Sequence, residues 1–497
     1  VLARMLESPE VKRDGRRAAR LHHALALTLR DEQKDEAGAI QELERALDAD
    51  PQLVQAFGDL EALLTGAGKW RELEQAYVRM IQRLPKGPEA ATARIALWKT
   101  LGELYRRALS DLEGARTAYQ VVVSAAPEDL GALEAYAELS ARVPGHAGEA
   151  VEAYRNLLQR GAAPQKVIGG LVNLHAEQKA YDQAYCAAQA LAFLVGGASQ
   201  EEGQVVGRLR RLARDTASAS LDGELWGKLQ HERLKGPMAA VLTLLAEEAA
   251  EIFVQQPKEL GLRERKDEID VQGSMLFFVN MYKYVARTLG LPTPRLFRTG
   301  EEGGRLQILP LKPPAMVAGE ELFKERPKKE LWFLIGKAMT FLRPELVLAR
   351  LMPRDQLDAV FQAATSLGTS RFVVTADLQL VDRLKRRLER ALPDATRTQK
   401  LKVLARAYCD VQQPGDVRAY LDAAELTSNR VGALLAGDLE VVRRAAFTER
   451  AAVSKLKEET RLRDLTLFAI SEDHTLLRER LGLSVVVPAN TPAEGKP

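Results

Sequence analysis

Apolar positions recur with a regular spacing along the first two hundred residues. In each unit three small or apolar residues follow one another at offsets of four and three, which places them on one face of a helix. The first position of the successive units holds Ala39, Leu73, Ala115, Ala150 and Ala184. The second position holds Leu43, Tyr77, Tyr119, Tyr154 and Ala188, and the third holds Ala46, Met80, Val122, Leu157 and Leu191. The pattern predicts one amphipathic helix in each unit.

Prolines set the ends of the first three of these helices. Pro51, Pro85 and Pro127 follow them, and proline disfavours helix in the residue before it. A helix pair of this length cannot bury its own apolar face, so we expect neighbouring pairs to stack and share a core. The alternative is an ordinary bundle of Ala-rich helices.

The repeated pattern resembles the tetratricopeptide repeat family. The family's glycine in the first helix is mostly missing, with only Gly102 near its place, and Leu73 and Ala188 depart from the usual alanine and aromatic residue. The resemblance implies an α-solenoid with a concave surface that binds a protein or peptide. No residue identifies the partner.

The pattern changes after Pro237. It predicts a long apolar helix from Met238 to Gln255 and another from Met275 to Leu289. Three short β-like segments follow, at Arg295–Arg298, Arg305–Leu309 and Ala315–Val317. A further helix is indicated by apolar residues at helical spacing, namely Leu331, Leu334, Ile335, Ala338, Met339 and Leu342. The expected fold is therefore mainly α, with a helical repeat region followed by an α+β region that holds a small sheet.

The order of these later elements resembles the core of the gluzincin peptidases of the CAAX-endopeptidase and heat-shock membrane-peptidase type. The segments A-M-V-A-G-E-E-L-F and E-L-W-F-L-I-G-K-A-M-T-F-L-R-P-E-L carry the resemblance, together with D-A-A-E-L-T-S-N-R downstream. It implies a zincin-like domain in which Lys337 stands at the first zinc histidine, Ala338 at the catalytic glutamate and Phe341 at the second histidine. It also implies that Glu425 stands at the third ligand and Asn429 at the aspartate that orients a histidine.

This set of side chains lacks the chemistry of zinc hydrolysis. Histidines at i and i+4 would present two nitrogens to zinc, and the glutamate between them would activate water. Phenylalanine has no lone pair, alanine takes no proton, and a protonated lysine repels a dication. We therefore expect a pseudoenzyme with no catalytic residue, no bound metal and no cofactor. The alternative is that Lys337, Phe341 and Glu425 are a snorkelling lysine, a core aromatic and a surface carboxylate on unrelated helices.

The resemblance makes a geometric prediction. The first histidine and the downstream glutamate of the family face one metal, so Lys337 and Glu425 should face each other. We predict a nitrogen–oxygen distance within about 4 Å, with Phe341 filling the volume of the second imidazole.

Small and polar stretches around residue 200 and before residue 223 suggest a seam between domains. The expected organisation is helical repeats over 1–199, a linker or transition helices over 200–236, a pseudo-metallopeptidase-like domain over 237–485 and a flexible tail over 486–497.

Composition narrows the function classes. The 71 basic and 68 acidic residues leave a formal charge of +3, far from the excess of a dedicated nucleic-acid binder. Two basic runs, Arg208–Arg214 and the helix around Arg383, keep nucleic acid as an alternative partner, although no aromatic residues alternate with the arginines of the first run. The six histidines have no ligand spacing.

The two cysteines, Cys186 and Cys409, lie far apart, which fits a reducing cytoplasm. No apolar run is long enough to predict a transmembrane segment. The chain begins at Val1 rather than at a methionine, which leaves room for a preceding segment of a longer protein.

The leading interpretation is a non-catalytic protein-interaction scaffold. Its partner would be a protein or peptide held by the repeat surface and by a groove beside the strand Arg305–Leu309, where an extended segment could pair. The three prolines after that strand could equally mark an edge protected from pairing. A hydrolase with an unconventional or subunit-completed site in the same cleft is the first alternative, and a nucleic-acid-binding protein is the second.

Overall fold

The computed structural model describes residues 2–162, 164–196, 206–300, 305–392, 395–411, 416–448 and 453–487, apart from the side chains of Lys12, Ala250 and residues 446–448. The chain divides into two compact units, Val1–Ala163 and Pro164–Pro497. The fold is mainly α with one small sheet, as the sequence predicted. No described helix combines the length and the apolar character needed to cross a membrane.

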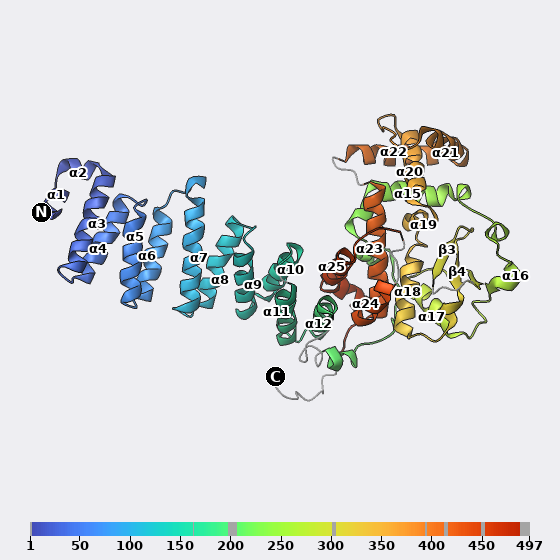
Figure 1. Cartoon of the computed structure of the whole chain (residues 1–497), viewed down its shortest axis with the longest axis horizontal. Helices are drawn as coiled ribbons and strands as arrows, with labels where there is room; N and C mark the ends of the chain where they lie inside the picture. Colours follow the sequence, from blue (N-terminus) through green and yellow to red (C-terminus); the bar gives the residue numbers. More distant parts are fainter. Residues whose placement is uncertain are drawn as a thin grey trace. The chain divides into compact units, whose positions relative to one another are not determined.

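The first unit is a row of antiparallel helices (Figure 1). They are α1 (Leu2–Leu6), α2 (Pro9–Arg13), α3 (Gly15–Asp31), α4 (Glu36–Ala49), α5 (Val54–Gly66), α6 (Trp70–Arg83), the 3-10 turn η1 (Pro88–Ala90), α7 (Ala91–Arg107), α8 (Leu112–Ala125), α9 (Leu130–Arg142) and α10 (Ala147–Gln159). Helices α4, α6 and α8 each end two residues before a predicted terminating proline. Aspartates cap the N-termini of α4 and α8. The side chain of Asp35 accepts from the backbone N–H of Gly38, and that of Asp111 accepts from the backbone N–H of Gly114.

The three apolar positions of each predicted repeat are buried, whereas the terminating prolines are not: Pro51 is partly buried, and Pro85 and Pro127 are exposed, because they follow the helices rather than pack on their inner face. The first positions Ala39, Leu73, Ala115, Ala150 and Ala184 are at most 4% exposed. The second and third positions are also buried, including Leu43, Tyr77, Tyr119, Tyr154 and Ala188. Gly102 on α7 permits one close contact, because a Cβ there would lie 2.9 Å from Cε2 of Tyr119 on α8. The periodic pattern therefore reports the packed face of each second helix.

The second unit holds the remaining elements. Its helices before the second strand are α11 (Pro164–Glu177), α12 (Tyr181–Val195), α14 (Gly223–Leu229), η2 (Glu232–Lys235), α15 (Pro237–Glu248), η3 (Ala250–Ile252), η4 (Pro257–Leu260), α16 (Glu264–Asp267) and α17 (Phe277–Thr288). Those after it are η5 (Glu320–Phe323), α18 (Lys328–Thr340), α19 (Pro344–Leu351), α20 (Arg354–Gly368), α21 (Leu378–Ala391), α22 (Ala395–Asp410), α23 (Val417–Ala436), α24 (Leu439–Thr448), α25 (Glu458–Ala469) and α26 (Glu472–Leu481).

The sheet contains β1 (Glu268–Ile269), β2 (Leu296–Thr299), β3 (Leu306–Leu309) and β4 (Ala315–Gly319), in the order β1-β2-β4-β3. Strand β4 runs parallel to β2 and antiparallel to β3, with Ile308 opposite Met316. The three predicted strands are confirmed. Strand β1 was not predicted, because two residues carry no alternation that a sequence pattern can detect.

One predicted helix is too long. Helix α15 ends at Glu248 rather than at Gln255. The chain has left the helix by Gln255, whose backbone N–H donates to the carbonyl oxygen of Pro310 at 2.7 Å, just beyond β3. This contact with the end of a strand requires a non-helical path that hydropathy does not reveal.

The last helix pair with the repeat pattern belongs to the second unit. The structure divides at Ala163, whereas the sequence placed the end of the repeats at 199. On α12 the carboxylate of Asp182 accepts from Arg478 of α26 at 2.8 Å, and both side chains are buried. The side chain of Gln189 accepts from the backbone N–H of Leu439 at 2.9 Å. These polar contacts join α12 to the C-terminal helices.

The transition segment also contributes to the second unit. Trp226 and Leu229 of α14 and Leu234 of η2 are buried in its main apolar cluster. Residues 200–205 of the predicted linker and residues 488–497 of the predicted tail lie outside the described residues.

Helices α18 and α23 lie side by side in this unit (Figure 1). Two glycines, Gly336 and Gly432, lie at their contact. A Cβ built on Gly336 would lie 3.5 Å from Cα of Gly432. One built on Gly432 would lie 2.7 Å from Cδ2 and 2.8 Å from the carbonyl oxygen of Phe333. The two backbones therefore approach closely at a point set by missing side chains.

We expect Gly432→Ala to destabilise the second unit by about 1–3 kcal/mol, because the new methyl group meets both the buried ring and the backbone carbonyl of Phe333 on α18. Chemical unfolding followed by circular dichroism measures the loss. Gly169→Ala on α11 is the matched control, since no atom lies within 4 Å of its Cβ position, and it should stabilise the helix slightly. Equal effects of the two substitutions would contradict the close approach of the two helices.

Candidate functional site: a buried lysine–glutamate pair between two helices

Helix α18 positions the first part of the candidate site. The predicted apolar stripe is buried or partly buried, and so are Trp332, Phe333 and Lys337 outside the stripe. A helix buried on nearly all sides needs neighbours on nearly all sides. Here α17, α23, α24 and β3 pack around it. Lys337 is therefore a basic residue inside the core, where an ammonium requires a partner.

That partner is Glu425 of α23. Nζ of Lys337 lies 3.1 Å from Oε1 of Glu425, with the two residues 2% and 0% exposed. The predicted distance is confirmed. The alternative interpretation is wrong on two residues, because Lys337 does not reach solvent and Glu425 is not a surface carboxylate. The other carboxylate oxygen, Oε2, accepts from the backbone N–H of Val453 at 3.2 Å.

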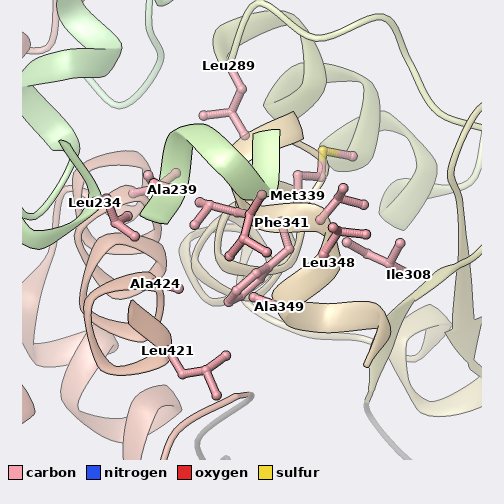
Figure 2. Packing of buried hydrophobic residues seen from close by; sticks show 14 of the residues in the cluster. Leu234, Ala239, Leu289, Ile308, Met339, Phe341, Leu348, Ala349, Leu421 and Ala424 are labelled. Atoms are coloured by element: carbon pink, nitrogen blue, oxygen red, sulfur yellow. The ribbon is translucent and has the colours of Figure 1, made fainter. Parts of the chain in front are cut away.

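Phe341 follows the last turn of α18 and is 1% exposed. Figure 2 shows its ring among apolar side chains that come from several elements. They include Ala239 of α15, Met339 of α18, Leu348 and Ala349 of α19, and Leu421 and Ala424 of α23. The ring thus occupies a dry position that offers no lone pair to a ligand.

Ala338 and Asn429 complete the set of residues that the resemblance singles out. Ala338 is partly buried and packs against the main cluster. Asn429 lies one helical turn after Glu425 and is 1% exposed, and within the described part of the chain its Oδ1 has no hydrogen-bond partner. The neighbouring Arg430 makes a two-pronged pair with Asp464, with Nε 2.9 Å from Oδ2. The structure therefore brings Lys337 of α18 and Glu425 of α23 into contact and places Asn429 on α23 with Glu425.

Two contacts near the site could not be predicted from the sequence. The first is the bond from the backbone N–H of Val453 to Glu425. In the second, the backbone N–H of His231 donates to Oγ1 of Thr427 at 3.0 Å. Burial, helped by the positive charge of Arg430, lowers the pKa of His231, so its imidazole is neutral near pH 7. Across the described residues, no group of three or more His, Cys, Asp or Glu side chains is placed to hold a metal ion.

The strand predicted to border a peptide groove is an edge strand. Among the described residues β3 pairs with β4 alone. The carbonyl oxygen of Pro310, which follows the strand, already accepts from Gln255. One side of β3 therefore stays without a strand partner along Leu306–Leu309, while its end is held by the chain itself.

The first basic run is partly engaged within the protein. Arg210 lies 3.3 Å from the carboxylates of both Asp438 and Glu440. An arginine that holds two carboxylates is not a free phosphate contact. The second run, around Arg383, lies on α21 and is largely exposed.

In the repeats, tyrosines of the second helix bond to glutamates of the first. Oη of Tyr77 donates to Glu61, and Oη of Tyr119 donates to Glu103, both at 2.7 Å and both across the same sequence separation. Burial and the neighbouring carboxylate raise the pKa of both phenols. A recurring glutamate sixteen residues before the repeat tyrosine was the available sequence signal.

Comparisons with known proteins add little. No protein-family model matches the chain, and no curated protein matches it. Among solved structures it is similar to one from a functional characterization of Pseudomonas aeruginosa PilF, with 16% sequence identity over 41% of this chain and 88% of that chain. The TM-score of 0.23 is too low for the similarity to support a conclusion on fold or function.

Proposed function

We propose that this chain is a non-catalytic protein-interaction scaffold, in which helical repeats hold one partner and a metal-free, peptidase-like unit serves as a second docking module. The observation that carries the proposal is the buried ion pair of Lys337 with Glu425 at 3.1 Å. It lies where the resemblance to gluzincin peptidases puts the first and third ligands of the zinc.

The chemistry of the pair favours structure over hydrolysis. A divalent cation beside Glu425 would meet the ammonium of Lys337, and like charges in a dry interior repel strongly. Phe341, which the resemblance aligns with the second histidine, has no lone pair for a metal and is 1% exposed. The position of the catalytic glutamate holds Ala338, which cannot accept a proton from water.

The repeats supply the first docking surface. The first unit carries exposed apolar side chains at Val54, Val121 and Leu130. It also has an open pocket of about 520 Å³, whose lining includes Arg13, Arg16, Asp50 and Arg83. Mixed apolar and charged surface on a helical array suits a protein or peptide ligand.

The edge of the sheet offers a second mode of docking. An extended segment could add to β3 through backbone hydrogen bonds. Such binding needs neither a metal nor a catalytic base, so it is compatible with loss of hydrolytic chemistry.

Metal content and proteolysis test the proposal. The purified chain is expected to carry far less than one zinc ion per molecule after exposure to zinc and washing. It should leave an unstructured substrate such as casein intact. An active zinc peptidase of the resembled type, treated in the same way, is the positive control. Stoichiometric zinc, or cleavage that a chelator abolishes, would overturn the proposal and favour a hydrolase.

A further inference from the structure

An open pocket of about 730 Å³ lies on one face of α22, and none of its lining residues belongs to the Lys337–Glu425 site. It is lined by Leu244 of α15 and, on α22, by Ala395, Thr396, Gln399, Lys400, Val403 and Leu404. The spacing of three and four between the residues from Thr396 to Leu404 puts them on one side of the helix. Val403 is 55% exposed. Helix α22 thus presents an apolar side chain at an open hollow large enough for ligand side chains.

Positive charge is concentrated around this pocket. Helix α22, which supplies most of the pocket lining, carries four Lys and Arg residues against one Asp, although the whole chain is nearly balanced at 71 to 68. Lys400 precedes Val403 by three residues and Arg406 follows it by three, so both flank Val403 on the helix surface, and both are exposed. Glu248 at the end of α15 offsets part of this charge, at 2.9 Å from Arg397 and 3.8 Å from Lys400.

We infer that this pocket docks an acidic, amphipathic helix of a partner protein. Apolar side chains of that helix, one turn apart, enter the hollow against Leu244 and Val403. Its carboxylates face Lys400 and Arg406, which fixes the orientation and speeds the encounter. The apolar hollow matches the apolar face of such a helix, and the basic residues beside it match its carboxylates.

The structure favours this partner over nucleic acid. Stacking on bases needs exposed aromatic side chains, but the aromatic residue of α21 and α22 is Tyr408, which is 9% exposed. Its ring centroid lies 4.9 Å from that of Phe361, so it belongs to the core. A phosphate backbone would also gain nothing from an apolar hollow.

The structure also favours a peptide over an anionic membrane. A helix that lies in a membrane surface inserts its apolar face among the lipids. The apolar face of α21 is used internally, because Val381, Leu384 and Leu388 are buried in the main cluster. The apolar part of α22 lies in a hollow with Glu248 close by, whereas a bilayer presents a flat surface.

The inference goes beyond the proposed scaffold, because the pocket lies outside both the repeats of the first unit and the Lys337–Glu425 pair. It holds whether or not the peptidase-like unit has activity. Zinc content and casein cleavage test the scaffold proposal alone, so failure of one proposal is distinguishable from failure of the other.

A displayed library of helical peptides tests the inference. Each member has about eighteen residues, enough for helix formation in water, with Leu, Ile, Val or Phe at i, i+3, i+4 and i+7 and Glu or Asp elsewhere. A matched library carries Lys in place of every acidic residue. Both are selected on the full chain, and enriched peptides are measured by fluorescence anisotropy. We expect enrichment from the acidic library alone.

Variants assign the binding to the pocket. Val403→Asp, and separately Lys400→Glu with Arg406→Glu, should each weaken binding by about tenfold or more. Val373→Asp is the control, because Val373 is 77% exposed in the same unit and does not line the pocket, so it should leave affinity unchanged. Circular dichroism confirms that all three variants fold.

Three results would overturn the inference. The first is that no acidic peptide is enriched. The second is that Val373→Asp weakens binding as much as Val403→Asp. The third is that phosphatidylserine vesicles or an RNA hairpin displace the peptide from the chain and no longer bind the Val403→Asp variant. That result would assign the pocket to a membrane or to nucleic acid.

Discussion

Glu425→Ala is expected to lower the free energy of unfolding of the second unit by about 3–5 kcal/mol. The substitution leaves the ammonium of Lys337, which is 2% exposed, without its carboxylate in an apolar interior. It also removes the acceptor for the backbone N–H of Val453. Urea unfolding followed by circular dichroism measures the change. Glu389→Ala on the exposed side of α21 is the control, and its effect should stay within about 0.5 kcal/mol.

Removing both charges should behave differently. Lys337→Met combined with Glu425→Leu replaces the ion pair by apolar groups of similar volume, and such exchanges are often neutral or stabilising. We therefore expect the double variant to be more stable than either single variant, with a large coupling in the double-mutant cycle. Additive losses from the two single substitutions would show that the residues act independently and would contradict a direct pair.

The repeats were predictable because their signal is local. The residues that share a helix face are separated by three or four positions, and a terminating proline acts on its own neighbour. Burial of Ala39, Tyr119 and Tyr154 follows from that pattern alone. The pattern could not reveal that α12 joins the second unit, because this depends on Asp182 meeting Arg478, near the other end of the chain.

The candidate site shows the same division. From hydropathy, Lys337 and Glu425 are simply polar residues on two separate helices, and nothing indicates that they meet. Only the resemblance to a zinc-binding arrangement predicted their contact. The contacts of Val453 with Glu425 and of His231 with Thr427 were not predicted. Each involves a backbone N–H, which every residue except proline carries, so the side-chain sequence gives no indication of it.

Reintroducing the missing ligands gives the sharpest test of the peptidase-like interpretation. We expect the variant Lys337→His, Ala338→Glu, Phe341→His to bind about one zinc ion per chain, whereas the unchanged chain binds none. Residues 337 and 341 are four positions apart, and Phe341 is the residue that caps the C-terminal end of α18. An imidazole at 337 would replace an ammonium that lies 3.1 Å from Oε1 of Glu425, so that carboxylate could serve as the third ligand.

Metal analysis and thermal unfolding provide the readout, since zinc that binds only the folded state raises the midpoint. A variant that keeps Phe341 has one imidazole fewer and should bind zinc far more weakly. Adding Asn429→Asp should strengthen binding by about 10–100-fold if residue 429 orients a new imidazole, as a supporting carboxylate does in metal sites. A folded triple variant that takes up no zinc would remove the link to zinc peptidases and leave the Lys337–Glu425 pair as a feature of the core alone.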